Sequence, residues 1–115
     1  MKYLLLIYED EKARARYTDS ERQKISGEYL RLTEEMKQSG KYQGGNPLQP
    51  TSTAMTVRVS GDKPLVIDGP FAETKEQLGG YYLIDATDID DAIKIAAKIP
   101  AARTGSVEVR PIMEM

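Results

Sequence analysis

The sequence predicts a single-domain α+β protein in which the elements follow the order β-α-β-β-α-β, with one extra hairpin strand in the middle. Its length of 115 residues suits one domain. Two segments place apolar residues at helical spacing between signals that start and stop a helix. The segments around them are short apolar or alternating runs, which are typical of strands. Both helices are therefore expected on one face of a single sheet.

The first strand and the first helix are marked by local patterns. Residues 3–8 form a continuous apolar run, which predicts a central strand buried on both faces. Thr18 and Glu21 have the spacing of a capping box at the start of a helix. Gly40 stands where a left-handed residue ends one. The apolar face of this helix is expected to consist of Ile25, Tyr29, Leu32 and Met36.

The middle of the chain contains a hairpin between two loops. The Gly, Asn and Pro content of residues 41–50 predicts a loop. Residues 55–59 alternate apolar and polar side chains, and after a tight-turn signal residues 63–68 form a second strand. Gly79 and Gly80 lead into a further strand, so they indicate a bulge or close packing. A phosphate-binding loop would instead be followed by a helix.

The second helix follows a strand at residues 81–86. Thr87 or Asp88 can cap its start, and Pro100 ends it. Its apolar face is expected to consist of Ile89, Ala92, Ile93 and Ala96. A last strand is expected at residues 105–112.

The predicted arrangement leaves one face of the sheet without helices. Several strands carry apolar residues on both of their sides, so the second face also needs a cover. A second copy of the chain is the natural cover, and the sequence therefore predicts a homodimer.

The composition limits the chemistry. The absence of cysteine and histidine excludes disulfides, thiolate metal sites, the usual general base near neutral pH and the Ser-His-Asp triad. General acid–base catalysis would have to use Asp, Glu, Lys or Tyr.

The net charge of −2, from 16 basic and 18 acidic residues, offers no basic surface for nucleic acid. No membrane span or signal segment is present, so a cytoplasmic location is expected. Because Asp88, Asp90 and Asp91 suit a helix N-terminus better than a calcium loop, neither a metal nor a cofactor is expected.

The stretch DGPF has two interpretations. In the first, Asp68 begins a turn in which its carboxylate accepts hydrogen bonds from backbone N–H groups. Pro70 restricts Gly69, and Phe71 anchors the loop in the core. In the second, Asp68 lies at a strand end beside a cleft, where partial desolvation would favour a general base.

Phe71 is also a candidate for binding a substrate, and five further residues are candidates as well. Arg58 and Arg110 lie in the middle of strands, where they either bind a carboxylate or form an ion pair at the surface or at a dimer interface. Glu73 and Lys75 either belong to a solvated turn or face a ligand as an acid–lysine pair. The hydroxyl of Tyr8 either lies at the edge of the core or orients a substrate.

Four stretches resemble the DGPF-domain group of the YCII-related proteins. In chain order they are YLLLIYEDE, DGPFAETKEQLGGYYLI, TDIDDAIKIAAKIPAA and GSVEVRPIME. The resemblance implies a ferredoxin-like α+β fold that dimerises through its sheets into a dimeric α/β barrel. Some YCII-related proteins are thought to use a His–Asp pair. Asp68 matches the aspartate, but the chain has no histidine, so that mechanism is excluded here.

The resemblance leaves two functions open. DGPF proteins are often associated with extracytoplasmic-function sigma factors, which implies a regulatory or sensing dimer with a pocket for a small anionic ligand near Asp68. Dimeric barrels of this kind also include muconolactone isomerases and small monooxygenases. The alternative is therefore a cofactor-independent isomerase or dehydratase. In that enzyme Asp68 would be the general base, and Arg58 or Arg110 would hold an anionic substrate.

Overall fold

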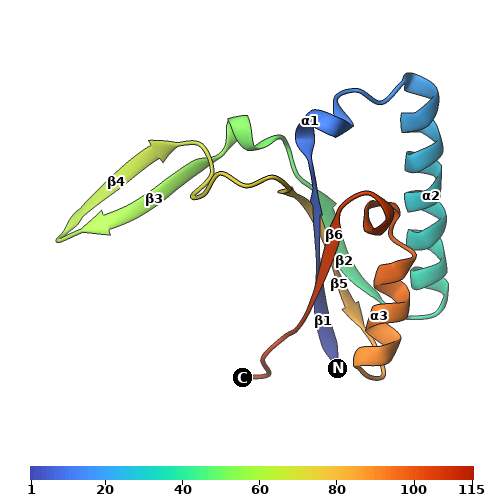
Figure 1. Cartoon of the computed structure of the whole chain (residues 1–115). Coiled ribbons are helices and arrows are strands. Elements are labelled where there is room, and N and C mark those ends of the chain that lie inside the picture. Colours follow the sequence, from blue (N-terminus) through green and yellow to red (C-terminus); the bar gives the residue numbers. More distant parts are fainter.

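The computed structural model describes residues 1–115 and contains two antiparallel sheets. The main sheet has the strand order β2-β5-β1-β6, and β3 pairs only with β4. Both α2 and α3 lie on one face of the main sheet, while the β3–β4 hairpin projects to the other side (Figure 1). This mixed α+β architecture is consistent with a ferredoxin-like fold. The elements are β1 (Lys2–Glu9), α1 (Glu11–Arg14), α2 (Asp19–Gln38), β2 (Tyr42–Pro47), β3 (Met55–Ser60), β4 (Lys63–Asp68), β5 (Gln77–Asp85), α3 (Ile89–Ala97) and β6 (Ser106–Pro111).

Strand β1 lies between β5 and β6, which confirms the predicted central position. Burial on both faces is not seen in the single chain, because one face of β1 is only half-buried. Alternate residues of a strand point to opposite faces. Tyr3, Leu5 and Ile7 face the helices and are buried. We call the other side of the main sheet the open face, because both helices lie on the far side of the sheet from it. The register places on the open face Leu4, Leu6, Tyr8, Leu78, Tyr81, Leu83, Glu108 and Arg110.

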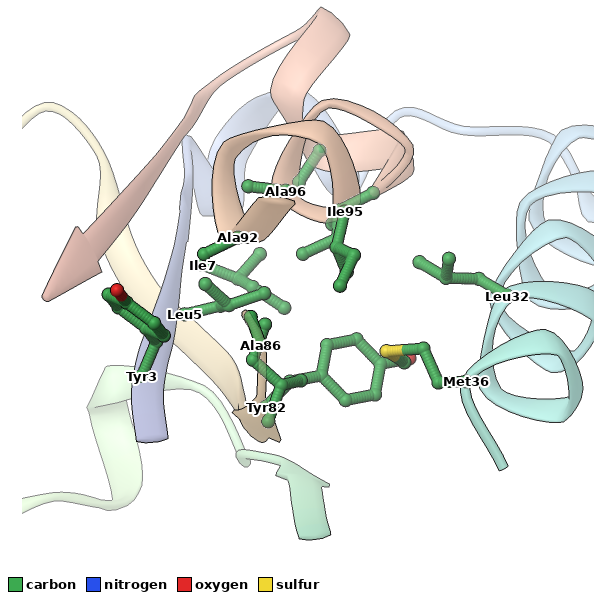
Figure 2. Packing of buried hydrophobic residues seen from close by; sticks show 13 residues of the cluster. Tyr3, Leu5, Ile7, Leu32, Met36, Tyr82, Ala86, Ala92, Ile95 and Ala96 are labelled. Carbon is green, nitrogen blue, oxygen red and sulfur yellow. The ribbon is translucent and has the colours of Figure 1, made fainter. Parts of the chain in front are cut away.

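The hydrophobic core lies between the main sheet and the two helices. Figure 2 shows side chains of β1 and β5 converging with those of α2 and α3. The core has 13 buried residues: Tyr3, Leu5, Ile7, Leu32, Met36, Tyr82, Ile84, Ala86, Ala92, Ile95, Ala96, Ile99 and Ala101.

Helix α2 begins with the predicted capping box. The Glu21 N–H donates to the Thr18 hydroxyl at 3.1 Å, and the Thr18 N–H donates to the Glu21 carboxylate at 3.0 Å. After the helix, Gly40 adopts a φ of +76°, as predicted for its C-terminal end. The helix buries only Leu32 and Met36, both in its C-terminal half. Its N-terminal half therefore stands further from the core.

Helix α3 begins at the predicted cap, since the Asp88 carboxylate accepts from the Asp91 N–H at 2.9 Å. The predicted apolar face is wrong in part. Ile89 and Ile93 are 42% and 50% exposed. The buried positions are instead Ala92, Ile95 and Ala96, because two alanines let the helix lie close to the sheet while Ile95 fills the core.

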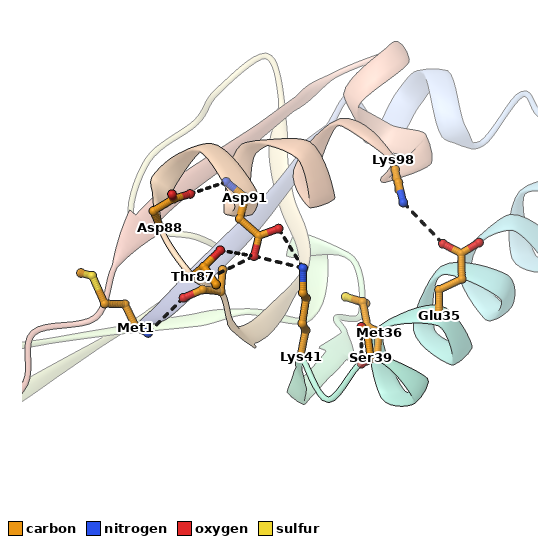
Figure 3. A network of polar contacts seen from close by, with 10 residues as sticks. Met1, Glu35, Met36, Ser39, Lys41, Thr87, Asp88, Asp91 and Lys98 are labelled. Carbon is orange, nitrogen blue, oxygen red and sulfur yellow. Dashed lines mark hydrogen bonds and ion pairs between the residues drawn. The ribbon is translucent and has the colours of Figure 1, made fainter.

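An ion pair ties the start of β2 to the first turn of α3 (Figure 3). The Lys41 ammonium donates to both carboxylate oxygens of Asp91, at 2.8 and 3.0 Å. The Thr87 N–H and hydroxyl donate to the same carboxylate. The bond from Lys41, followed by that from the Thr87 backbone, lowers the pKa of Asp91 to about 2.

The prediction of a loop at residues 41–50 is wrong, because β2 occupies Tyr42–Pro47 and pairs with β5. Its glycines and proline disfavour a strand locally, but pairing with β5 overrides that preference. A Cβ on Gly45 would lie 2.8 Å from both the Tyr81 carbonyl oxygen and the Tyr82 ring. The glycine is therefore required by the close approach of the two strands.

The predicted hairpin is confirmed as two strands but not as part of the main sheet. We call β3 and β4 together the arm. Every residue of the arm is exposed except Thr56, which is half-buried. At its root, the Gly69 N–H donates to the Ala54 carbonyl at 2.7 Å, and the Thr56 hydroxyl donates to the Gly69 carbonyl at 2.8 Å. No helix of the chain has the length and apolar character needed to cross a membrane.

Candidate functional site

A cleft of about 590 Å³ lies between the N-terminal half of α2 and the main sheet. It forms because α2 packs into the core only through its C-terminal half. Residues from α1 and from the turn after α3 also line it. Its lining consists of Ile7, Glu9, Arg14, Tyr17, Arg22, Ile25, Ser26, Tyr29, Thr33, Tyr42, Gly45, Asn46, Pro47, Gly79, Gly80, Tyr81, Tyr82, Pro100, Ala101, Arg103 and Thr104.

Two glycines of β5 contribute to the sheet side of the cleft. The pairing of β1 with β5 shifts register between Ile7–Gly80 and Tyr8–Leu78, which leaves Gly79 as an extra residue. This confirms the predicted bulge. A Cβ on Gly80 would lie 3.1 Å from the Asn46 carbonyl oxygen, which confirms the close packing as well. The missing side chain at Gly80 lets β2 approach β5 closely, and a Cβ on Gly79 would lie 3.5 Å from the Arg14 guanidinium.

Two tyrosines of the cleft, Tyr82 and Tyr29, have hydroxyl protons that matter for a ligand. The Thr33 hydroxyl donates to the Tyr29 carbonyl at 2.9 Å, so the Tyr82 hydroxyl, 3.0 Å from the same oxygen, must be the donor to Thr33. The Tyr29 hydroxyl donates to no group of the chain and is free for a ligand. Burial, and secondly the negative charge of Glu9, raises the pKa of Tyr29 to about 12. Burial also raises the pKa of Tyr82. Both hydroxyls therefore keep their protons at neutral pH.

Two of the three arginines of the cleft have acidic partners. Arg14 lies 3.8 Å from the Glu9 carboxylate, which also accepts from the Thr104 hydroxyl. Arg103 lies 2.8 Å from the carboxylate of Glu28. Each of these pairs is close to neutral as a unit, so neither one gives the cleft a strong charge.

Arg22 has no acidic partner. Its Nε donates to the Tyr17 carbonyl at 3.3 Å, and its Nη2 donates to the Arg14 carbonyl at 3.3 Å. These neutral acceptors hold the guanidinium at the C-terminal end of α1 without cancelling its charge. Nη1 makes no hydrogen bond, so it retains two N–H donors. The cleft therefore combines an uncompensated cation with a free phenolic donor and an edge-to-face pair of tyrosine rings, Tyr42 and Tyr82.

Residues 1–115 match the YCII-related domain. The chain belongs to the YCII-related family. It is also similar to an uncharacterised protein of Rhizobium meliloti (strain 1021), with 39% identity over 114 residues. The similarity covers 97% of this chain and 92% of that protein.

The cleft of this YCII-related protein contains none of the site residues predicted from the sequence. Asp68 is exposed at the root of the arm, and its carboxylate makes no hydrogen bond. The turn depends on Gly69, whose φ of +102° favours glycine. The prediction that Phe71 anchors this loop in the core is wrong, because its side chain is 80% exposed. A site near Asp68 stays a prediction.

The other predicted residues fall in three places. Arg58 lies on the arm, and Glu73 and Lys75 are exposed in the connection to β5. Tyr8 and Arg110 lie on the open face, where Arg110 forms an ion pair with Glu108, as the ion-pair interpretation predicts. A single YCII-related chain therefore does not bring these candidates together.

The sequence interpretation missed the three arginines of the cleft, including Arg22, the one without an acidic partner. Arg14 is the last residue of α1, a short helix that was not predicted. Arg22 lies in the first turns of α2, and Arg103 lies in the turn Pro100–Arg103. Tyr29 was recognised only as part of an apolar face. The useful signal was its hydroxyl, since a polar group at an otherwise apolar helix position needs a partner or a cavity.

Proposed function

We propose that this YCII-related protein binds a small organic anion with a flat apolar body in the cleft beneath α2. One observation carries the proposal: an arginine without an acidic partner, Arg22, lines the same cleft as the free hydroxyl proton of Tyr29. The anionic group of the ligand binds the guanidinium, and its body packs on the tyrosine rings.

The size and chemistry of the cleft support binding. Ligand pockets have volumes of roughly 300–1,000 Å³ and combine apolar walls with a few polar groups, and this cleft of about 590 Å³ lies within that range. The raised pKa of Tyr29 keeps its hydroxyl a donor near neutral pH, which suits recognition of an anion. It would not suit proton abstraction.

The biological role in this proposal is sensing in the cytoplasm. Support for it comes from the resemblance to the DGPF-domain group, through Asp68 to Phe71, and from the association of such proteins with sigma factors. Co-purification with an extracytoplasmic-function sigma factor of the same organism, with and without a bound anion, tests this part. A sigma factor that neither co-purifies nor responds to the anion would contradict it.

The binding proposal is tested by thermal unfolding with matched ligands. The probes are benzoate, 2-naphthoate and indole-3-acetate, each beside the neutral amide of the same ring system. A ligand at about 100 times its dissociation constant adds roughly 2.7 kcal/mol to the free energy of unfolding, which raises the midpoint by several degrees. We expect at least one carboxylate to raise the midpoint while its amide does not. Equal shifts from acid and amide would contradict the proposal.

Substitutions locate the site. Arg22→Gln and Tyr29→Phe are expected to remove or weaken the carboxylate shift. Arg16→Gln, which removes an exposed arginine that does not line the cleft, should leave it intact. Asp68→Asn tests the alternative of a site near that aspartate. If Asp68→Asn abolished the shift while Arg22→Gln retained it, the ligand would bind at the arm and not in the cleft.

A further inference from the structure

The cleft beneath α2 contains a carboxylate that its binding of an anion does not use. Strand β1 ends at Glu9, which lines the cleft and whose side chain is only 14% exposed. The turn after α3 packs closely against this residue, because a Cβ on Gly105 would lie 3.2 Å from the Glu9 Cγ. The end of the strand and this close contact together fix the position of the Glu9 side chain.

One oxygen of the Glu9 carboxylate has no hydrogen-bond donor. Oε2 accepts from the Thr104 hydroxyl at 3.1 Å. Oε1 lies 3.8 Å from Nε of Arg14, which is too far for a hydrogen bond, and no other group of the chain donates to it. A largely desolvated carboxylate oxygen without a donor is costly. Oε1 is therefore an acceptor that a ligand in the cleft can use.

Arg14 connects this acceptor to the cation of the cleft. Its backbone carbonyl accepts from Nη2 of Arg22 at 3.3 Å, while its guanidinium approaches Glu9. Arg14 is the last residue of α1, and Figure 1 shows α1 at the same end of the molecule as the start of α2. The carboxylate and the Arg22 guanidinium thus lie on either side of one residue, so a single ring-sized ligand can contact both.

The two groups select opposite chemistry in a ligand. Arg22 has no acidic partner and binds the anionic end. Glu9 is the more buried member of its ion pair, since its side chain is 14% exposed and that of Arg14 is 50% exposed. This part of the cleft therefore offers an acceptor, and it would repel a second anionic group of the ligand.

We propose that the ligand of the cleft is an aromatic carboxylate that carries an amino or hydroxyl group on the part of its ring away from the carboxylate. This group donates a hydrogen bond to Oε1 of Glu9, while the carboxylate binds Arg22. The inference rests on the proposed binding function and names its ligand class. Glu9 is then a specificity-determining residue, because a buried polar group discriminates against ligands that leave it unpaired.

Titration calorimetry with matched benzoates tests the ligand class on the wild-type protein. The probes are 3- and 4-aminobenzoate, 3- and 4-methylbenzoate, and the two dicarboxylates isophthalate and terephthalate. Amino and methyl groups have nearly the same size, and burial alone would favour methyl. We expect at least one aminobenzoate to bind at least about tenfold more tightly than its methyl counterpart, since hydrogen bonds to a charged acceptor are strong. The dicarboxylate with the same substitution should bind most weakly.

A matched pair of variants assigns the preference to Glu9. In Glu9→Gln the amide oxygen is expected to keep the bond from Thr104, so an NH2 group replaces Oε1 and cannot accept. We expect this variant to bind methylbenzoate as the wild type does and to lose the preference for aminobenzoate. Glu34→Gln is the control and should retain it, because Glu34 is exposed on α2 and does not line the cleft.

The outcomes separate this inference from the proposed function. Equal binding of the amino and methyl compounds, or tightest binding of a dicarboxylate, would overturn the role of Glu9 while leaving an anion site in the cleft. A preference for aminobenzoate that survives in Glu9→Gln would also overturn it, because the amino group would then bind elsewhere. If no carboxylate bound the wild type, the proposed function would fail and this inference with it.

Discussion

At the scale of single residues, Gly45 and Gly44 provide a matched pair on β2. A Cβ on Gly45 would meet a backbone oxygen and the Tyr82 ring, whereas a Cβ on Gly44 meets nothing within 4 Å. We expect Gly45→Ala to lower the free energy of unfolding by roughly 1–3 kcal/mol through overpacking. Gly44→Ala should be neutral or stabilise by up to about 1 kcal/mol. Chemical denaturation of the two variants measures the difference, and equal effects would show that β2 and β5 are not so close.

Asp91 gives a prediction about acid stability. Its pKa is lowered from 3.8 to about 2 by the bond from Lys41. A lowered pKa contributes stability that is present above the unfolded value and is lost as the pH falls through the folded value. We therefore expect Asp91→Asn to flatten the pH dependence of the unfolding free energy between about pH 4 and pH 2. Asp90→Asn is the control, because Asp90 makes no hydrogen bond and should keep the wild-type profile in this window.

At the scale of elements, α2 is held unevenly. Leu32 and Met36 fix its C-terminal half, while Ile25 and Tyr29 face the cleft. Amide hydrogen exchange reports the free energy of local opening. We expect amides of the first two turns to exchange markedly faster than those near Leu32. A carboxylate bound in the cleft should slow the exchange of the amides in the first two turns. Uniform protection along the helix would mean that the cleft does not weaken its N-terminal half.

Elements were predictable where their signals are local. The capping box at Thr18, the cap at Asp88 and the alternation of β3 act within a few residues, so the sequence alone locates those boundaries. Strand β2 was missed because its pairing with β5 is a tertiary effect. The exposed side of α3 was misjudged at Ile89 and Ile93 because periodicity does not say how a helix is rotated against its sheet.

The cleft was unpredictable for a related reason. Its lining comes from β1, α1, α2, β2, β5 and the turn after α3, several of which are distant in sequence. Arginine is a residue type that often binds anions, but no sequence pattern shows that Arg22 lacks an acidic partner. The absence of a partner depends on where the acidic residues lie in the folded chain. The stretch DGPF drew attention to Asp68 because a motif can be recognised in the sequence without knowledge of the fold.

At the scale of the whole molecule, the single chain is extended. The radius of gyration over Cα atoms is 16.1 Å, against roughly 13 Å for a compact chain of about this length. The arm accounts for the larger radius of gyration, because it projects from the molecule and contributes no residue to the hydrophobic core (Figure 1). The sequence predicted that the sheet would need a second copy as its cover. It did not predict that the hairpin would leave the sheet, because strand patterns do not specify pairing partners.

The exposed arm also has a consequence for how the chain avoids aggregation. Both of its strands are edges, and apolar edge strands pair readily with other chains before they find their proper cover. Asp62 and Lys63 place opposite charges at the tip, and Pro64 removes a backbone donor from the start of β4. Charged residues and prolines beside an apolar strand act as gatekeepers against such pairing. The charges and the proline at the tip therefore oppose edge-to-edge pairing of the exposed valine-bearing strands with other chains.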